Sequence, residues 1–207
     1  MTGGTLLVVP MKDPARAKTR LRGAMGPAET ARFALRLFDR TLALLAGMRA
    51  HGRLPDTTLA VVTGHDGIAS RATEAGLQTI QERPGADLPQ AVADAAGFAV
   101  GTGHARLCVL PADLAAPDAA DIAQLLAQDF GGPGVALVPS RDWGTNALLA
   151  APPDAIAFAY GVRSFHAHCA AATAAGLTPR VLPLESLRWD IDRSEDLAEF
   201  FGMEGQG

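Results

Sequence analysis

The sequence has few cysteines, only Cys108 and Cys169 in 207 residues. Two cysteines cannot build a disulfide framework and form no Cys-x-x-Cys motif, which is typical of a reducing compartment, so we expect a cytoplasmic protein. Long hydrophobic runs are also missing, and no segment has the length needed to span a bilayer. The N-terminus has no basic segment followed by a long apolar core, so we expect no signal peptide.

Positive charge is scarce as well, with 18 Lys and Arg against 22 Asp and Glu and a formal net charge of −4. Proteins that bind a phosphate backbone carry a basic face, so nucleic acid is not an expected partner. The five histidines show no metal-binding spacing. His166 and His168 are two residues apart, would point to different faces of a helix, and are interpreted as structural or surface residues. Neither a GxxxxGKS/T loop nor a GxGxxG loop is present.

The chain does contain the apolar sequence that a sizeable core needs. Hydrophobic residues make up 48% and charged residues 19%, which is typical of a globular protein, and the length suits one domain, 1–207, with 203–207 as a frayed tail. Strand patterns cover 5–9, 58–63, 77–81, 106–110, 135–139, 146–151 and 180–184. Helical patterns begin at Pro27, run from an Asp66 N-cap to Gly76, and cover 88–100, 119–128, 164–175 and 194–201. This alternation predicts an α/β fold with a mainly parallel sheet and helices on both faces.

A basic loop follows the first strand. Pro10 and Pro14 interrupt regular structure, and the loop carries the cations Lys12, Arg16, Lys18 and Arg20. Ligands of open α/β sheets bind outside the carboxyl ends of the strands, so this cluster is typical of an anion site, with phosphate as the expected ligand. A solvated basic loop is the alternative interpretation.

Three aspartates also follow strand patterns. Asp113 comes directly after the strand 106–110, and Asp190 and Asp192 flank Ile191 in the sequence WDID. Residues two apart in an extended segment point to the same side, and two like charges held together are costly unless a cation lies between them. Carboxylates of this kind suit Mg²⁺ bound together with substrate phosphates, whereas turn or capping roles are the alternative. The acids at 195 and 196 fall in the first turn of the last helix, where they interact favourably with the helix dipole without a ligand.

Two further loops have the residues of a ligand site. The segment 143–146 has the sequence WGTN, whose Gly, Thr and Asn suit a tight turn that presents backbone N–H groups. The segment 161–164, GVRS, precedes a helix whose N-terminus is suited to an anion. A plain N-cap role for Ser164 is the alternative, and the two roles are compatible.

Five segments together resemble the family of 2-phospho-L-lactate guanylyltransferases, which includes relatives acting on phosphoenolpyruvate or 3-phosphoglycerate in the biosynthesis of the deazaflavin coenzyme. These segments read VPMKDPARAKTRL, LPADL, GTNAL, YGVRSFHAH and WDIDRSEDL, and they follow the family order over nearly the whole chain. The resemblance implies a single-domain nucleotidyltransferase fold of the glycosyltransferase-A type with a mixed, mostly parallel sheet. It also implies that a phosphorylated three-carbon acid attacks the α-phosphorus of GTP and releases pyrophosphate.

The resemblance implies a role for each matching residue. The metal, Mg²⁺ with two ions expected, would be held by Asp113, Asp190 and Asp192. The phospho-acid would be held by Lys12, Thr145, Asn146, Gly161 and Ser164. GTP, the co-substrate, would be held by Pro10, Lys18, Arg20, Leu88 and Asp113, and the catalytic cations would be Lys12, Lys18 and Arg20.

The sequence departs from the family pattern at two loops. Pro89 follows Leu88 where the family often has Asn nearby, and Ala115 stands where the family usually has Pro. Both departures bear on base preference. Two alternatives to guanylyl transfer are a molybdopterin or sugar-phosphate nucleotidyltransferase, which usually carries a glycine-rich loop after the first strand, and a non-catalytic nucleotide-binding regulator. The expected partners are small molecules, with no nucleic acid and no membrane, and a homodimer is the expected assembly.

Overall fold

Seven strands form one sheet in the order β3-β2-β1-β4-β6-β5-β7 in the computed structural model, which describes residues 3–204. The strands are β1 (Thr5–Pro10), β2 (Thr57–Thr63), β3 (Gln78–Gln81), β4 (Arg106–Val109), β5 (Gly134–Pro139), β6 (Thr145–Ala151) and β7 (Arg180–Val181). β6 pairs antiparallel with β4 and β5, whereas the other pairings are parallel. The sheet is therefore mixed and mostly parallel, as predicted.

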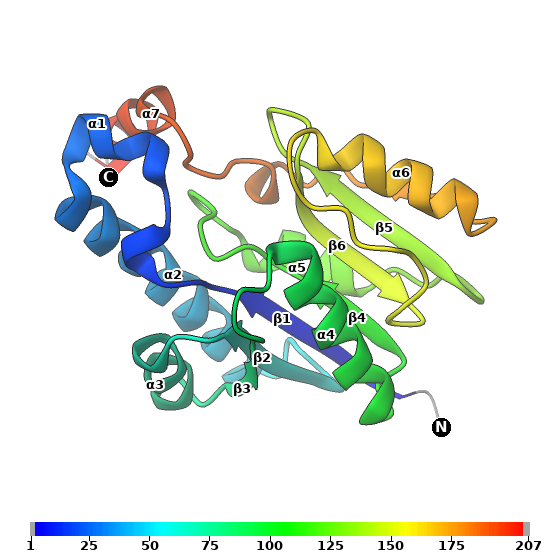
Figure 1. Ribbon diagram of the computed structural model, residues 1–207. Coiled ribbons are helices and arrows are strands. Elements are labelled where there is room, and N and C mark those ends of the chain that lie inside the picture. Colours follow the sequence, from blue (N-terminus) through cyan, green and yellow to red (C-terminus); the bar gives the residue numbers. More distant parts are fainter. Residues whose placement is uncertain (1–2, 205–207) are drawn as a thin grey trace.

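Helices cover both faces of this sheet (Figure 1). They are α1 (Arg22–Met25), α2 (Pro27–Ala50), α3 (Asp66–Glu74), α4 (Leu88–Gly101), α5 (Ala119–Leu126), α6 (Ser164–Ala174) and α7 (Ser194–Glu204). Alternate residues of β1 serve the two faces: Leu7 and Val9 join a core with α2, α3 and α5, and Leu6 and Val8 join a core with α4 and α6. A strand buried on both faces needs such a continuous apolar run, which explains its sequence.

A smaller apolar cluster joins the loop after β1 to the C-terminal helix. Leu21 and residues of α2 pack there against Trp189, Ile191 and residues of α7. Figure 1 shows α1 and α7 side by side at the same end of the molecule. This packing holds two segments that are far apart in sequence against each other.

The predicted elements are all present, with corrections at their ends. His65 is the N-cap of α3 and Asp66 is its first helical residue, so the capping prediction for Asp66 was wrong, whereas Gly76 follows the helix at a φ of 74° as predicted. The predicted strand 180–184 shortens to two residues, and α7 runs to Glu204 rather than ending at 201. The predicted frayed tail therefore begins within a helix, and 205–207 lie outside the described residues. No helix in the described part is long and apolar enough to cross a membrane.

Candidate active site

Two adjoining cavities lie at the edge of the sheet where β1 and β4 end and β6 begins. The inner cavity, about 370 Å³, is lined by Pro10, Met11, Lys12, Ala17, Lys18, Ala34, Val62, Glu82, Leu88, Ala91, Val109, Pro111, Ala112, Asp113, Thr145, Asn146, Tyr160 and Asp192. The outer cavity, about 510 Å³, shares Leu88, Pro111, Asp113, Thr145, Asn146, Tyr160 and Asp192 and adds Arg20, Ser140, Asp142, Gly144, Gly161, Val162, Arg163, Ser164, Asp190 and Arg193. Every residue to which the resemblance gave a role lines one of the two cavities, whereas Arg16 of the basic loop and Trp143 line neither.

Backbone pairing brings the three predicted aspartates together. Leu114 and Asp190 form an antiparallel bridge, and the N–H of Ile191 donates to the carbonyl of Asp113 at 3.3 Å. Asp190 and Asp192 both line the outer cavity, while Ile191 between them is fully buried in the apolar cluster below α7. The extended geometry predicted for this segment therefore holds.

Lys18 lies between two of these carboxylates. Its Nζ is 2.8 Å from Asp113 Oδ2 and 3.3 Å from Asp192 Oδ1, and only 4% of its side chain is exposed. It also donates to the carbonyl of Ile191 at 2.5 Å. Burial opposes its charge, but the attraction of Asp113 and Asp192 outweighs burial and raises the pKa of Lys18 above its usual value. The ammonium therefore offsets part of the negative charge of the acidic cluster.

Within residues 3–204, Asp190 pairs with no such cation. Its Oδ1 accepts a hydrogen bond from Asn146 Nδ2 at 3.1 Å. Burial, followed by the charges of Asp113 and Asp192, raises the pKa of Asp190 to about 6. The carboxylates are therefore close enough to repel one another, which is the situation that an added cation relieves.

The three aspartates have the chemistry that Mg²⁺ prefers, but their side chains are not arranged as a set of metal ligands. Mg²⁺ prefers hard oxygen ligands and is often held by one or two carboxylates plus substrate phosphates, and the mutual repulsion at Asp190 fits a site that gains from a cation. Within residues 3–204, however, no three His, Cys, Asp or Glu side chains are placed so that they could hold a metal ion together. Two of the three predicted ligands face Lys18 instead.

The last helix contributes an acid that orders the segment before it. Asp196 Oδ2 accepts the backbone N–H of Asp192 at 3.1 Å and that of Arg193 at 2.8 Å. The sequence predicted only a favourable dipole interaction for Asp196. Because these two hydrogen bonds hold the backbone of Asp192, Asp196 also sets the position of that carboxylate.

A buried hydroxyl network lies on the other side of the outer cavity. The N–H of Ala159 donates to His168 Nε2 at 2.9 Å, so this nitrogen is an acceptor and Nδ1 carries the proton. Nδ1 then donates to Thr145 Oγ1 at 2.8 Å, and Ser164 Oγ donates to the same oxygen at 3.3 Å. With its acceptor positions used, Thr145 has its own O–H available to donate to a ligand.

The loop glycines shape the same wall. Gly161 has a φ of 144°, which favours glycine, and a Cβ on Gly144 would lie 2.7 Å from Ser140 Oγ. Ser164 is the first helical residue of α6, with Arg163 as N-cap, and makes no capping hydrogen bond. The capping interpretation of Ser164 was therefore wrong, since its hydroxyl serves Thr145.

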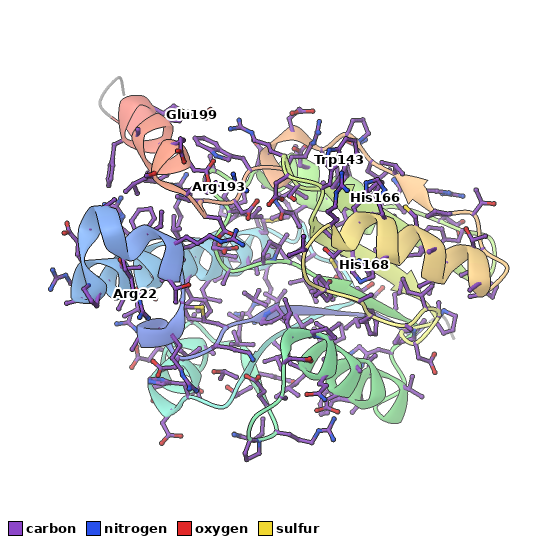
Figure 2. All side chains as sticks on the ribbon, turned by 45° about the horizontal axis from the view of Figure 1, so that its top comes forward. Arg22, Trp143, His166, His168, Arg193 and Glu199 are labelled. Atoms are coloured by element: carbon purple, nitrogen blue, oxygen red, sulfur yellow. The ribbon has the colours of Figure 1, made fainter. Side chains whose placement is uncertain are left out.

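The histidines of α6 do occupy different faces, as predicted. His168 is fully buried, whereas His166 stacks on Trp143 at a ring distance of 5.4 Å. Figure 2 shows Trp143 and His166 close together on one side of α6 and His168 on the other side of that helix. Sequence reasoning missed the role of His168 because no spacing pattern marks it.

The predicted basic loop does not form a group of four free cations. Lys12 donates to the carbonyl of Ala86 at 2.5 Å and lies 3.3 Å from Glu82 Oε1, so it lines the inner cavity and is absent from the outer one. Lys18 is paired as described, Arg16 is exposed, and Arg20 lies 3.9 Å from Asp192 Oδ2 with 60% of its side chain exposed. The structure thus separates Lys12 from Gly161 and Ser164, with which the sequence grouped it.

The two family departures lie outside both cavities. Neither Pro89 nor Ala115 lines them, and Ala115 is fully buried against the cluster below α7. Glu82, which the sequence analysis did not single out, does line the inner cavity and is 8% exposed. A carboxylate at the end of a short strand was the available signal for it.

Curated relatives are similar to this chain over most of its length. A 3-phospho-D-glycerate guanylyltransferase from Colwellia psychrerythraea is 35% identical and covers 93% of this chain and 89% of its own. A phosphoenolpyruvate guanylyltransferase from Sphaerobacter thermophilus is 34% identical, with coverage of 96% and 93%. A 2-phospho-L-lactate guanylyltransferase from Methanothermobacter thermautotrophicus is 28% identical, with coverage of 98% and 86%.

Solved structures share the fold at lower identity. A protein from Desulfovibrio desulfuricans G20 assigned to the nucleotide-diphospho-sugar transferases has a TM-score of 0.74 at 19% identity, covering 99% of this chain and 88% of its own. The 4-diphosphocytidyl-2C-methyl-D-erythritol synthase of Anaerococcus prevotii has a TM-score of 0.62 at 8% identity, covering 99% and 97%. The fold is therefore the predicted nucleotidyltransferase type. The family described as Guanylyl transferase CofC like matches residues 5–207, and this chain belongs to that family of guanylyltransferases.

Proposed function

We propose that the protein joins GMP from GTP to a phosphorylated three-carbon acid, in the biosynthesis of the deazaflavin coenzyme. A phosphate oxygen of the acid attacks the α-phosphorus, the bond from that phosphorus to the bridging oxygen of the β-phosphate breaks, and pyrophosphate leaves. The observation that carries the proposal is the meeting of two cavities at the cluster of Asp113, Lys18 and Asp192. The names of the relatives support the same reaction class.

The outer cavity suits the phospho-acid. Thr145, with its O–H available, and Asn146, whose amide lies beside Asp190, offer donors next to the loop of Gly161 and Ser164. Hydroxyl and amide donors are the groups that bind phosphate and carboxylate oxygens. Lys12 lines only the inner cavity, so it faces the nucleotide rather than the acid.

The reaction as proposed needs no general base from the protein. A phosphate monoester is largely dianionic near neutral pH because its second pKa is about 6. Burial lowers the pKa of His168 to about 4, so this histidine is neutral and orients Thr145 rather than moving a proton. The residues of the site therefore act by positioning and by neutralising charge.

Asp113, Asp190 and Asp192 would hold Mg²⁺, which supplies neutralisation of the phosphate charges when bound. Lys18 pairs with two of these carboxylates, so Mg²⁺ would compete with its ammonium for them. Lys18 and the exposed Arg20 are the cations that would contact the triphosphate.

The test is incubation of the pure protein with GTP, Mg²⁺ and each of three acids, 2-phospho-L-lactate, phosphoenolpyruvate and 3-phosphoglycerate, with the product identified by mass spectrometry. We expect one acid to give a GMP adduct and pyrophosphate, with GTP preferred over ATP, CTP and UTP, and loss of turnover in excess EDTA. Equal turnover with another nucleotide would reject guanylyl transfer in favour of another transferase of this fold. Nucleotide binding without pyrophosphate release would indicate a regulator. Cytoplasmic location and the homodimer stay predictions.

A further inference from the structure

Glu82 is a buried carboxylate in a mostly apolar cavity. It follows β3, its backbone N–H donates to the carbonyl of Thr63 at 3.0 Å, and its side chain is 9% exposed. Among the described residues the one partner of its side chain is Lys12, whose Nζ lies 3.3 Å from Oε1. Oε2 makes no hydrogen bond within the described part of the chain, so it keeps its capacity to accept hydrogen bonds from a ligand in the cavity.

Lys12 supplies the complementary donor beside this carboxylate. Its ammonium has three N–H groups, of which one donates to the carbonyl of Ala86 and one faces Glu82. The third is available next to the carboxylate. The inner cavity thus presents one donor and a pair of acceptors side by side, between apolar side chains that include Val62, Ala91 and Val109.

We infer that Glu82 and Lys12 bind the Watson–Crick edge of guanine and make the inner cavity selective for that base. Guanine presents the acceptor O6 beside the donors N1–H and N2–H₂ on one edge. The ammonium of Lys12 matches O6, and the carboxylate of Glu82 matches the two donors in a bidentate pair. This inference deepens the proposed function, on which it depends for the nucleotide.

The same pair of side chains opposes adenine. Adenine presents N6–H₂ where guanine has O6 and the lone pair of N1 where guanine has N1–H. The amino group would then face the ammonium of Lys12 and the lone pair the carboxylate of Glu82, so the buried carboxylate would lose the donors that guanine offers it. A site built to pair with polar groups rejects an analogue that leaves those groups unpaired.

The test measures binding by calorimetry, without an acceptor acid, for GTP, ATP and xanthosine triphosphate. Xanthine keeps N1–H and O6 but has an acceptor oxygen in place of N2–H₂. In the Glu82→Gln variant, the amide oxygen of Gln can accept N1–H of xanthine. The amide N–H can donate to the oxygen that xanthine carries in place of the guanine N2–H₂ group. We expect Glu82→Gln to weaken the binding of GTP about 10- to 100-fold. We also expect the Kd for xanthosine triphosphate, divided by the Kd for GTP, to fall at least tenfold.

Glu74 is an exposed glutamate on α3 outside both cavities, so Glu74→Gln is the matched control. It should change neither the affinity for GTP nor the ratio of the two Kd values. A gain in xanthosine triphosphate affinity relative to GTP cannot result from misfolding, which weakens both. Unchanged base preference in Glu82→Gln overturns the inference while leaving guanylyl transfer intact. Equal affinity of the unaltered protein for GTP and ATP overturns both, whereas guanine preference without turnover overturns only the proposed reaction.

Discussion

His168 should make the protein lose stability at acidic pH. The ring is fully buried, its Nε2 accepts the N–H of Ala159, and its Nδ1 donates to Thr145. A second proton on the ring would point at an N–H donor and would place an unpaired charge in the interior. Burial accordingly lowers the pKa of His168 from 6.5 to about 4.

Proton linkage gives the sign and size of the change in the free energy of unfolding with pH. Between pH 6.5 and pH 4 the unfolded chain binds a proton at this histidine and the folded chain does not, so the free energy of unfolding falls as pH falls. The stabilisation is complete above the unfolded pKa. A difference of about 2.5 pKa units at about 1.36 kcal/mol each corresponds to about 3 kcal/mol.

Asp190 acts in the opposite direction over part of this range. Its folded pKa of about 6 lies above the usual 3.8, so its protonation stabilises the folded state as pH falls from 6 to 3.8. The two groups therefore offset each other in the unaltered protein. A comparison with a histidine variant at each pH removes the contribution of Asp190, because Asp190 is present in both proteins.

The informative variant is His168→Asn, whose amide nitrogen can replace Nδ1 as the donor to Thr145. It leaves the N–H of Ala159 without an acceptor, so we expect it to be about 1–3 kcal/mol less stable than the unaltered protein at pH 7.5. Urea unfolding followed by tryptophan fluorescence between pH 4.5 and 8 should show this difference shrinking or reversing at acidic pH. Parallel stability curves over the whole range would refute the neutral, buried histidine.

Three further predictions concern the acidic cluster. Asp190→Asn keeps the hydrogen bond from the neighbouring amide but removes a disfavoured charge, so in metal-free buffer at pH 7.5 its free energy of unfolding should rise by about 2 kcal/mol while turnover falls by orders of magnitude. Lys18→Met leaves Asp113 without a cation and Asp192 with only the exposed Arg20, and it should cost about 3 kcal/mol of the free energy of unfolding. Mg²⁺ should raise the thermal midpoint of this variant more than that of the unaltered protein. Asp196→Asn weakens the charge-assisted hydrogen bonds that hold the backbone before α7, which are worth about 1.5–3 kcal/mol. Because this backbone then moves more freely, turnover should fall about tenfold. Glu195→Gln, in the same helical turn, should leave turnover within a few-fold.

Each of these has a result that contradicts it. A less stable Asp190→Asn would mean that the carboxylate is not destabilised by its neighbours. Equal Mg²⁺ responses of Lys18→Met and the unaltered protein would argue that lysine and metal do not compete for the same carboxylates. Equal effects at Asp196 and Glu195 would show that the hydrogen bonds to the backbone of Asp192 and Arg193 do not matter for activity.

The sequence by itself determined the class of fold and the position of the site. Apolar runs buried on two faces predict parallel strands, and the residues that end those strands must meet at one edge of the sheet. Asp113, Asp190 and Asp192 were found in this way, whereas Thr145 and Asn146 were found from the turn composition of the sequence WGTN. These are local signals, since a pattern of a few residues is enough to fix each of them.

Only the tertiary structure decided which charges pair. Lys18 meets Asp113 and Asp192 across 95 and 174 positions of the chain, and Lys12 meets Glu82 rather than the loop of Gly161 and Ser164. No local pattern contains such pairings, because the path of a loop depends on what it packs against. His168 became a positioning residue for the same reason: burial next to Thr145 and the N–H of Ala159 fixes its proton, and burial is a property of the folded chain.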